Sequence, residues 1–158
     1  MIEQEINDIL SAIDCKIATV ESCTGGLIAD KITNIPGCSK YFLGGVVSYD
    51  NEIKINVVRV PKKIIIDYGA VSKETAYHMA TGTKNLFKAD ITVATTGIVG
   101  PDGGTEEKPV GLVYIAVASE EITTEKYIFD GNRNEIKQKI AEQALTNLLK
   151  EIKRRFKI

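Results

Sequence analysis

The chain has 158 residues, of which 44% are hydrophobic and 26% are charged, and its formal net charge is −1. This length and balance fit one globular domain that can bury a core without a disulfide or metal to hold it together. The charge provides no general electrostatic attraction to nucleic acid or to an anionic membrane surface.

The first part of the chain predicts a helix, a strand and a second helix. Apolar residues at helical spacing over residues 2–13 predict an amphipathic helix, and residues 17–20 predict a short buried strand. Gly25 and Gly26 then predict a turn before residues 27–32, which have helical character.

The middle of the chain repeats this alternation. A turn at Pro36-Gly37 precedes a strand predicted over residues 44–49 and a short helix over residues 51–58, which Pro61 ends. Ser72 is the predicted N-cap of a longer helix. One face of that helix carries Ala76, Met79, Ala80, Thr83 and Phe87.

The last part predicts three strands and a long helix. Residues 91–96 are rich in β-branched side chains, and residues 110–119 and 124–129 predict a β-hairpin. A turn at residues 130–132 precedes a helix with apolar residues at four-residue steps over residues 136–156. Strands mixed with helices predict one α/β domain over residues 1–158. We expect a three-layer α/β/α sandwich with a mixed sheet.

Cysteine and histidine content limits the chemistry. Three cysteines without a secretory leader argue against a disulfide framework, and a single histidine without a C-x-x-C motif makes a metal site unexpected. The N-terminus is acidic where a signal peptide is basic, and no apolar run approaches the ~20 residues of a membrane span. These features predict a cytoplasmic protein with no membrane partner and no metal site.

Ser22 is the first candidate for chemistry. It follows a buried strand and precedes Gly25-Gly26 and a helix, which would place its hydroxyl at the carboxyl edge of the sheet. Unpaired backbone N–H groups at a helix N-terminus can bind an anion or a developing oxyanion. The alternative is an N-cap serine beside a tight turn, which position alone favours.

A serine nucleophile needs a base, and the lone histidine, His78, lies within an amphipathic helix far along the chain. Tyr49 and Lys54 follow the second predicted strand and could flank the same cleft as Ser22. A desolvated lysine can lose its proton near neutral pH and act as a base. The alternative is an exposed lysine on a short helix.

The glycine-rich segment 97–109 is long for a loop within one domain, and such loops are more often functional than idle. Thr105 and Lys108 could contact a phosphate there, although the segment lacks the spacing of a phosphate-binding Walker A loop. Arg133, at the start of the last helix, offers a second phosphate contact. A mobile Asp-Gly turn and a solvated arginine are the corresponding structural interpretations.

The basic C-terminal run 150–157 complements the dipole of the last helix. It contains neither interleaved aromatic residues nor a recognised nucleic-acid-binding motif. We therefore expect no nucleic-acid partner.

Several long motifs resemble one family in the same order along the chain. They are residues 21–26 (ESCTGG), 41–54 (YFLGGVVSYDNEIK), 69–72 (GAVS), 96–105 (TGIVGPDGGT) and 108–111 (KPVG). Together they resemble the C-terminal domain of the competence/damage-inducible protein CinA, which also occurs alone as nicotinamide mononucleotide (NMN) deamidase. The resemblance covers nearly the whole chain.

The resemblance implies an α/β/α amidohydrolase of pyridine nucleotide salvage that converts NMN and water to nicotinate mononucleotide and ammonia. Ser22 would be the nucleophile, Lys54 the base, and Tyr49 a partner that positions or relays the proton. The resemblance also implies that Thr96 and Arg133 help to hold the nucleotide, and backbone N–H groups around Thr24 to Gly26 would stabilise the oxyanion. The full set of residues that we expect to bind the substrate is Thr24, Gly25, Gly26, Asn51, Thr96, Gly97, Thr105, Lys108 and Arg133. This reaction would require no metal or organic cofactor, and a homo-oligomer is also expected.

Longer family members carry a large N-terminal domain that these 158 residues do not resemble, so we do not expect the activities of that domain here. Cys38 and Val99 also replace small residues common in the family, although neither is a proposed reacting group. Two rival hypotheses remain. One is a non-catalytic nucleotide-sensing or protein-interaction module linked to competence or DNA damage, and the other is an enzyme with Cys23 as its nucleophile.

Overall fold

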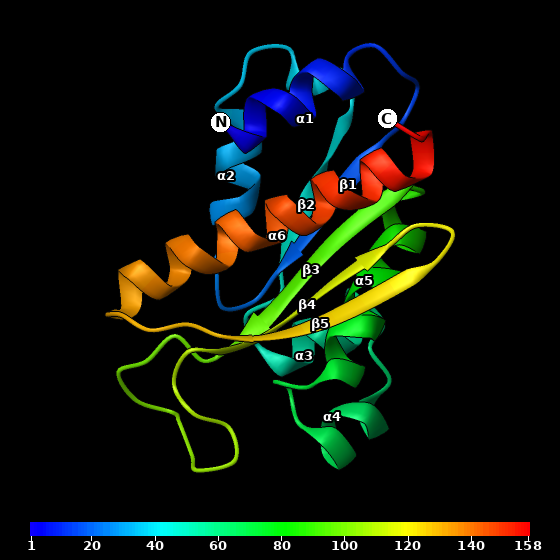
Figure 1. The fold of residues 1–158 in the computed structure, drawn as a ribbon. Coiled ribbons are helices and arrows are strands. Elements are labelled where there is room, and N and C mark those ends of the chain that lie inside the picture. Colours follow the sequence, from blue (N-terminus) through cyan, green and yellow to red (C-terminus); the bar gives the residue numbers. More distant parts are fainter.

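A five-stranded mixed sheet forms the centre of the computed structural model, which describes residues 1–158 (Figure 1). The strands are β1 (Ile17–Glu21), β2 (Phe42–Val47), β3 (Ile91–Gly97), β4 (Leu112–Ala118) and β5 (Ile122–Ile128). They lie in the order β2-β1-β3-β4-β5. The first three strands are parallel, whereas β4 runs antiparallel to both β3 and β5.

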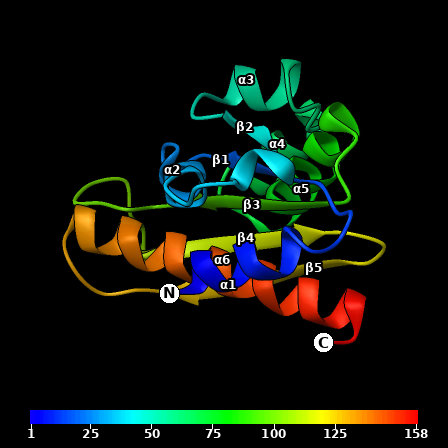
Figure 2. The same ribbon diagram turned by 90° about the horizontal axis from the view of Figure 1, so that it is seen from above.

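Helices cover both faces of this sheet, as Figure 2 shows, and this confirms the predicted α/β/α architecture. They are α1 (Ile2–Leu10), α2 (Leu27–Thr33), α3 (Asn51–Asn56), α4 (Lys62–Tyr68), α5 (Lys73–Phe87) and α6 (Arg133–Phe156), with a 3₁₀ turn over Cys38–Lys40. Helices α1 and α6 lie on one face and α5 lies on the other. No helix has the length and apolar character that crossing a bilayer requires.

The sheet separates two hydrophobic cores of unequal size. The larger, with 22 buried residues, joins α1, α2 and α6 to the sheet and includes Ile17, Ile28 and Ile140. The smaller, with 9, lies under α5 and includes Val20, Met79 and Ala116. Because neighbouring residues of a strand point to opposite faces, β1 contributes to both cores and is buried throughout.

The central position of β1 determines where a ligand can bind. The connection from β1 to β2 passes through α2 on one face, whereas the connection from β2 to β3 passes through α5 on the other. A crevice opens where two such connections leave the carboxyl ends of parallel strands in opposite directions. Here that point is the end of β1, immediately before Ser22.

Glu21, rather than Ser22, satisfies the N-terminus of α2. Its buried carboxylate accepts the N–H groups of Ile28 at 2.8 Å and Ala29 at 3.0 Å, and the Thr24 hydroxyl at 2.6 Å. The N-cap residue of α2 is Gly26, with φ of 103°. The N-cap interpretation of Ser22 is therefore wrong, because a negative charge from the last strand residue already binds these N–H groups.

Two further predictions differ from the structure. Strand β2 covers Phe42–Val47, whereas the sequence predicted residues 44–49. The strand begins earlier because Phe42 pairs with Ile17. It ends before Ser48 and Tyr49, whose carbonyls accept hydrogen bonds from the Lys54 side chain. Helix α4 was not predicted from the sequence. Its three consecutive isoleucines, residues 64–66, hide the helical period, and Pro61 is the N-cap of α4 as well as the end of the preceding segment.

Gly82 allows α5 to approach the segment after α3. A Cβ atom there would lie 1.8 Å from the Val58 carbonyl oxygen, which is backbone and cannot rotate away. We expect Gly82→Ala to destabilise the fold by about 2 kcal/mol, although alanine is the better helix former. Thermal unfolding should show a Tm about 4–8 °C lower. Asn85→Ala, on the exposed side of the same helix, is the control and should leave Tm unchanged or raise it.

The hydrogen bonds of Glu21 predict a second stability effect. Glu21→Gln replaces one carboxylate oxygen by an NH₂ group that cannot accept the N–H groups of α2, so we expect a loss of about 1–2 kcal/mol. Urea unfolding would measure this loss. Glu120→Gln, at an exposed turn, provides the matched control. Equal stability of the two variants would contradict the capping role of Glu21.

Candidate active site

A pocket of about 280 Å³ lies at the carboxyl ends of the three parallel strands. Ser22 follows β1, Tyr49 and Lys54 follow β2, and Thr96 and Gly97 end β3; all five line the pocket. The volume is close to the lower end of the usual range for small-molecule sites, about 300–1,000 Å³. The structure therefore brings the predicted serine, tyrosine and lysine to one cavity.

Ser22 is held at the start of a tight turn. Its N–H group donates to the Thr95 carbonyl of β3 at 3.0 Å, and its own carbonyl accepts the Gly25 N–H group at 3.1 Å. The N–H groups of Cys23 and Thr24 donate to no backbone carbonyl in this turn. Cys23 lines the pocket whereas Thr24 is buried outside it, so the Cys23 N–H group is the candidate oxyanion donor beside the serine.

Cys23 lines the same pocket but has unfavourable acid–base properties for a nucleophile. Its side chain is buried, and this burial raises the pKa of the thiol to about 12. The thiolate is the reactive form of cysteine and is scarce at neutral pH when the pKa is this high. The structure thus favours Ser22 over Cys23.

Lys54 is buried, with 1% of its surface exposed, and forms no salt bridge with a carboxylate. Its Nζ donates to the Ser48 carbonyl at 2.7 Å and to the Tyr49 carbonyl at 3.0 Å, and neither hydrogen bond goes to Ser22. Burial lowers the pKa of this amine, although the nearby Asp50 carboxylate opposes the shift. A neutral Lys54 would keep both bonds and have its lone pair free to accept a proton.

Tyr49 contacts the neighbouring groups through two different atoms. Its carbonyl binds Lys54, and its hydroxyl accepts a hydrogen bond from Arg133 Nη2 at 3.1 Å. Arg133 also donates through Nη1 to the Gly100 carbonyl at 2.6 Å, which joins the start of α6 to the glycine-rich loop. Since the hydroxyl accepts from Arg133, the phenolic proton remains available to a ligand.

The other predicted binding residues divide into two groups. Asn51, Thr96, Gly97 and Arg133 line the pocket, and Thr96 Oγ1 donates to the Ala70 carbonyl at 2.7 Å. By contrast, the following residues are not part of the pocket wall: Thr24, Gly25, Gly26, Thr105 and Lys108. The Thr24 hydroxyl points to Glu21, and Lys108 Nζ donates to the Tyr68 carbonyl at 2.8 Å, beside a different hollow.

Asp102 is a pocket residue that the sequence analysis did not assign. It is the single carboxylate among the residues that line the cavity, and it comes from the glycine-rich loop. Its position within Gly-Pro-Asp-Gly-Gly was the available signal, because a polar residue amid turn-forming residues often faces a ligand. No group of three or more His, Cys, Asp or Glu side chains is placed to hold a metal ion.

The chain is similar along most of its length to known proteins of one family. The model of the CinA C-terminal domain matches residues 1–152. A CinA-like protein from Geotalea uraniireducens is 51% identical over 122 residues, which are 77% of this chain and 29% of that protein. One from Dictyoglomus thermophilum is 47% identical over 137 residues, 86% of this chain and 33% of that protein. The chain thus spans about a third of their length.

Solved structures show the same fold. The competence/damage inducible protein CihA from Agrobacterium tumefaciens has a TM-score of 0.91 at 36% identity, covering 94% of this chain and 92% of that one. The competence damage-inducible protein A (ComA) from Klebsiella pneumoniae has a TM-score of 0.92 at 30% identity, covering 96% and 94%. The chain therefore belongs to the CinA C-terminal domain family.

Proposed function

We propose that this protein is a nicotinamide-nucleotide amidohydrolase that converts NMN and water to nicotinate mononucleotide and ammonia. The observation that carries this proposal is the buried lysine without a carboxylate partner, Lys54, in the wall of the pocket that also contains Ser22. Family membership and the resemblance of the Ser22, Tyr49 and Lys54 motifs to those of NMN deamidases support it.

In the proposed first step, Ser22 Oγ attacks the carboxamide carbon while the neutral Lys54 amine takes the hydroxyl proton. The tetrahedral oxyanion would accept a hydrogen bond from the Cys23 N–H group. Collapse breaks the C–N bond, and the proton from Lys54, helped by Tyr49, leaves with ammonia. This sequence forms an acyl ester on Ser22.

In the second step, water attacks the acyl ester and Lys54 again accepts a proton. Nicotinate mononucleotide is released and Ser22 regains its proton, so the enzyme returns to its starting state. Hydrogen bonds between Lys54 Nζ and two carbonyls support both steps, because they fix the amine without supplying the negative charge that would hold it protonated.

Asp102 and Arg133 provide opposite charges for substrate recognition. NMN carries a cationic pyridinium ring and an anionic phosphate, and the pocket wall contains one carboxylate and one guanidinium group. We propose that Asp102 is oriented toward the ring and Arg133 toward the phosphate. Opposite charges on a pocket and its ligand favour binding most when water is excluded.

The first test is ammonia release from NMN by purified protein. Ser22→Ala and Lys54→Met should each lower kcat by about 10³-fold or more, as loss of a nucleophile or its base does in serine hydrolases. Ser39→Ala and Lys63→Met, at exposed positions outside the pocket, are matched controls. NMN binding by the wild type without ammonia release would instead support the nucleotide-sensing module.

The second test is the pH dependence of kcat/KM. The base must be neutral, so activity should fall about tenfold per pH unit below the pKa of Lys54, which burial places below that of a free lysine. Asp50→Asn should move this limb to lower pH, since the Asp50 charge raises the pKa, and asparagine retains the N-cap. Glu52→Gln is the control, and an equal displacement in both variants would contradict the assignment.

A further inference from the structure

A second hollow, of about 460 Å³, adjoins the active-site pocket. Val71 lines both cavities, which are therefore neighbours. We call the second one the lysine hollow, and define it by the side chains that its wall presents for binding: Tyr68, Lys73, Lys108, Tyr114 and Lys126. None of these five residues lines the active-site pocket.

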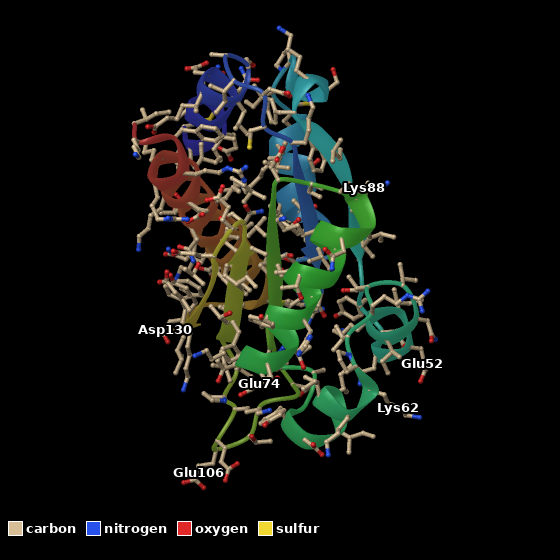
Figure 3. All side chains as sticks on the ribbon, turned by 90° about the vertical axis from the view of Figure 1, so that its right-hand side faces the viewer. Glu52, Lys62, Glu74, Lys88, Glu106 and Asp130 are labelled. Atoms are coloured by element: carbon tan, nitrogen blue, oxygen red, sulfur yellow. The ribbon has the colours of Figure 1, made fainter.

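Five separate segments contribute to the lysine hollow. Tyr68 ends α4, Lys73 begins α5, and Lys108 lies near the end of the glycine-rich loop. Figure 3 shows the loop around Glu106 projecting beyond the end of α5 that carries Glu74. Tyr114 of β4 and Lys126 of β5 are directly paired, and Tyr114 packs against the core under α5, so both side chains project to that face.

The lysine hollow has an excess of positive charge. Three ammonium groups surround it, and Glu74 is the only carboxylate in its wall. None of the three lysines forms a salt bridge, whereas other lysines of the chain do, such as Lys31 with Glu3. An excess of cations around one hollow raises the local concentration of anions.

Lys108 is held in place within this hollow. Its Nζ donates to the Tyr68 carbonyl at 2.8 Å, which leaves two N–H groups for a ligand. Gly69 makes room for the amine, because a Cβ atom at this residue would lie 2.8 Å from Nζ. Its φ of 87° also favours glycine. Lys108 thus presents a hydrogen-bonded ammonium group in the wall of the hollow.

We propose that the lysine hollow binds a free nucleoside monophosphate, at a site distinct from the active-site pocket. The phosphate would contact Lys73, Lys108 and Lys126, and the base would pack against the rings of Tyr68 and Tyr114. Ammonium groups bind phosphate through charge-assisted hydrogen bonds, and aromatic rings bind nucleobases by stacking. The inference does not depend on NMN hydrolysis, since no residue of the proposed chemistry takes part.

Isothermal titration calorimetry with AMP and with inorganic phosphate tests the proposal. The wild type should bind AMP with a Kd below about 1 mM, several-fold more tightly than it binds phosphate. Lys73→Ala/Lys126→Ala should weaken AMP binding at least ~10-fold. Tyr68→Leu should weaken AMP binding but leave phosphate binding unchanged. All three residues are exposed, so these variants should fold.

Lys62→Ala/Lys63→Ala, which removes two charges from the neighbouring α4, is the matched control and should bind AMP as the wild type does. Arg133→Ala distinguishes binding in the lysine hollow from binding in the active-site pocket, and this variant should also bind AMP as the wild type does. Absence of saturable AMP binding, or equal affinities for AMP and phosphate, would overturn the proposal. The proposal would also be overturned if Lys73→Ala/Lys126→Ala left AMP binding unchanged while Arg133→Ala abolished it.

Discussion

Parallel pairing of β1 between β2 and β3 is the constraint from which the site follows. Parallel neighbours cannot be joined by a tight turn, so each connection must cross a face of the sheet. Since α2 and α5 cross opposite faces, the chain separates above the carboxyl end of β1. The first residue beyond that strand, Ser22, consequently meets the segments that leave β2 and β3.

The buried Glu21 carboxylate determines which backbone N–H groups near Ser22 remain unpaired. The N–H groups at the start of α2 would otherwise be available to a ligand, but Glu21 binds two of them. Thr24 joins Glu21 on one side and lies 3.0 Å from the Thr95 hydroxyl on the other, which ties the turn to β3. The positive end of the α2 dipole therefore stabilises Glu21 and the turn that follows it. The unpaired backbone N–H groups near Ser22 come from this turn and not from α2.

The sequence predicted the elements whose signals are local. The buried strand before Ser22, the Ser72 N-cap and the long apolar stripe of α6 were all recognisable, and the structure confirms them. Signals that depend on distant partners were not recognisable. The Glu21 cap needs a helix that starts six residues later, and the burial of Lys54 depends on two carbonyls from the preceding strand end.

The same difference between local and distant signals explains why only some of the predicted site residues line the pocket. Residues at or just beyond the carboxyl ends of the parallel strands, such as Ser22, Tyr49 and Thr96, line the pocket because the sheet edge brings them together. Thr105 and Lys108 lie farther along a loop, whose path sequence spacing does not determine. The C-terminal basic run is paired with acidic residues, including Glu5 and Asp90, which agrees with its structural interpretation.

The glycine-rich loop joins two antiparallel strands, β3 and β4, and so lies outside the parallel part of the sheet that positions Ser22 and Lys54. Insertions or substitutions in this loop can alter the Asp102 side of the cavity without disturbing a crossover connection. The loop that carries Asp102 and the segments that carry Ser22 and Lys54 are therefore separate parts of the cavity wall. In the proposed enzyme, this division would let the loop change and alter substrate preference while the segments that carry the serine and lysine stay the same.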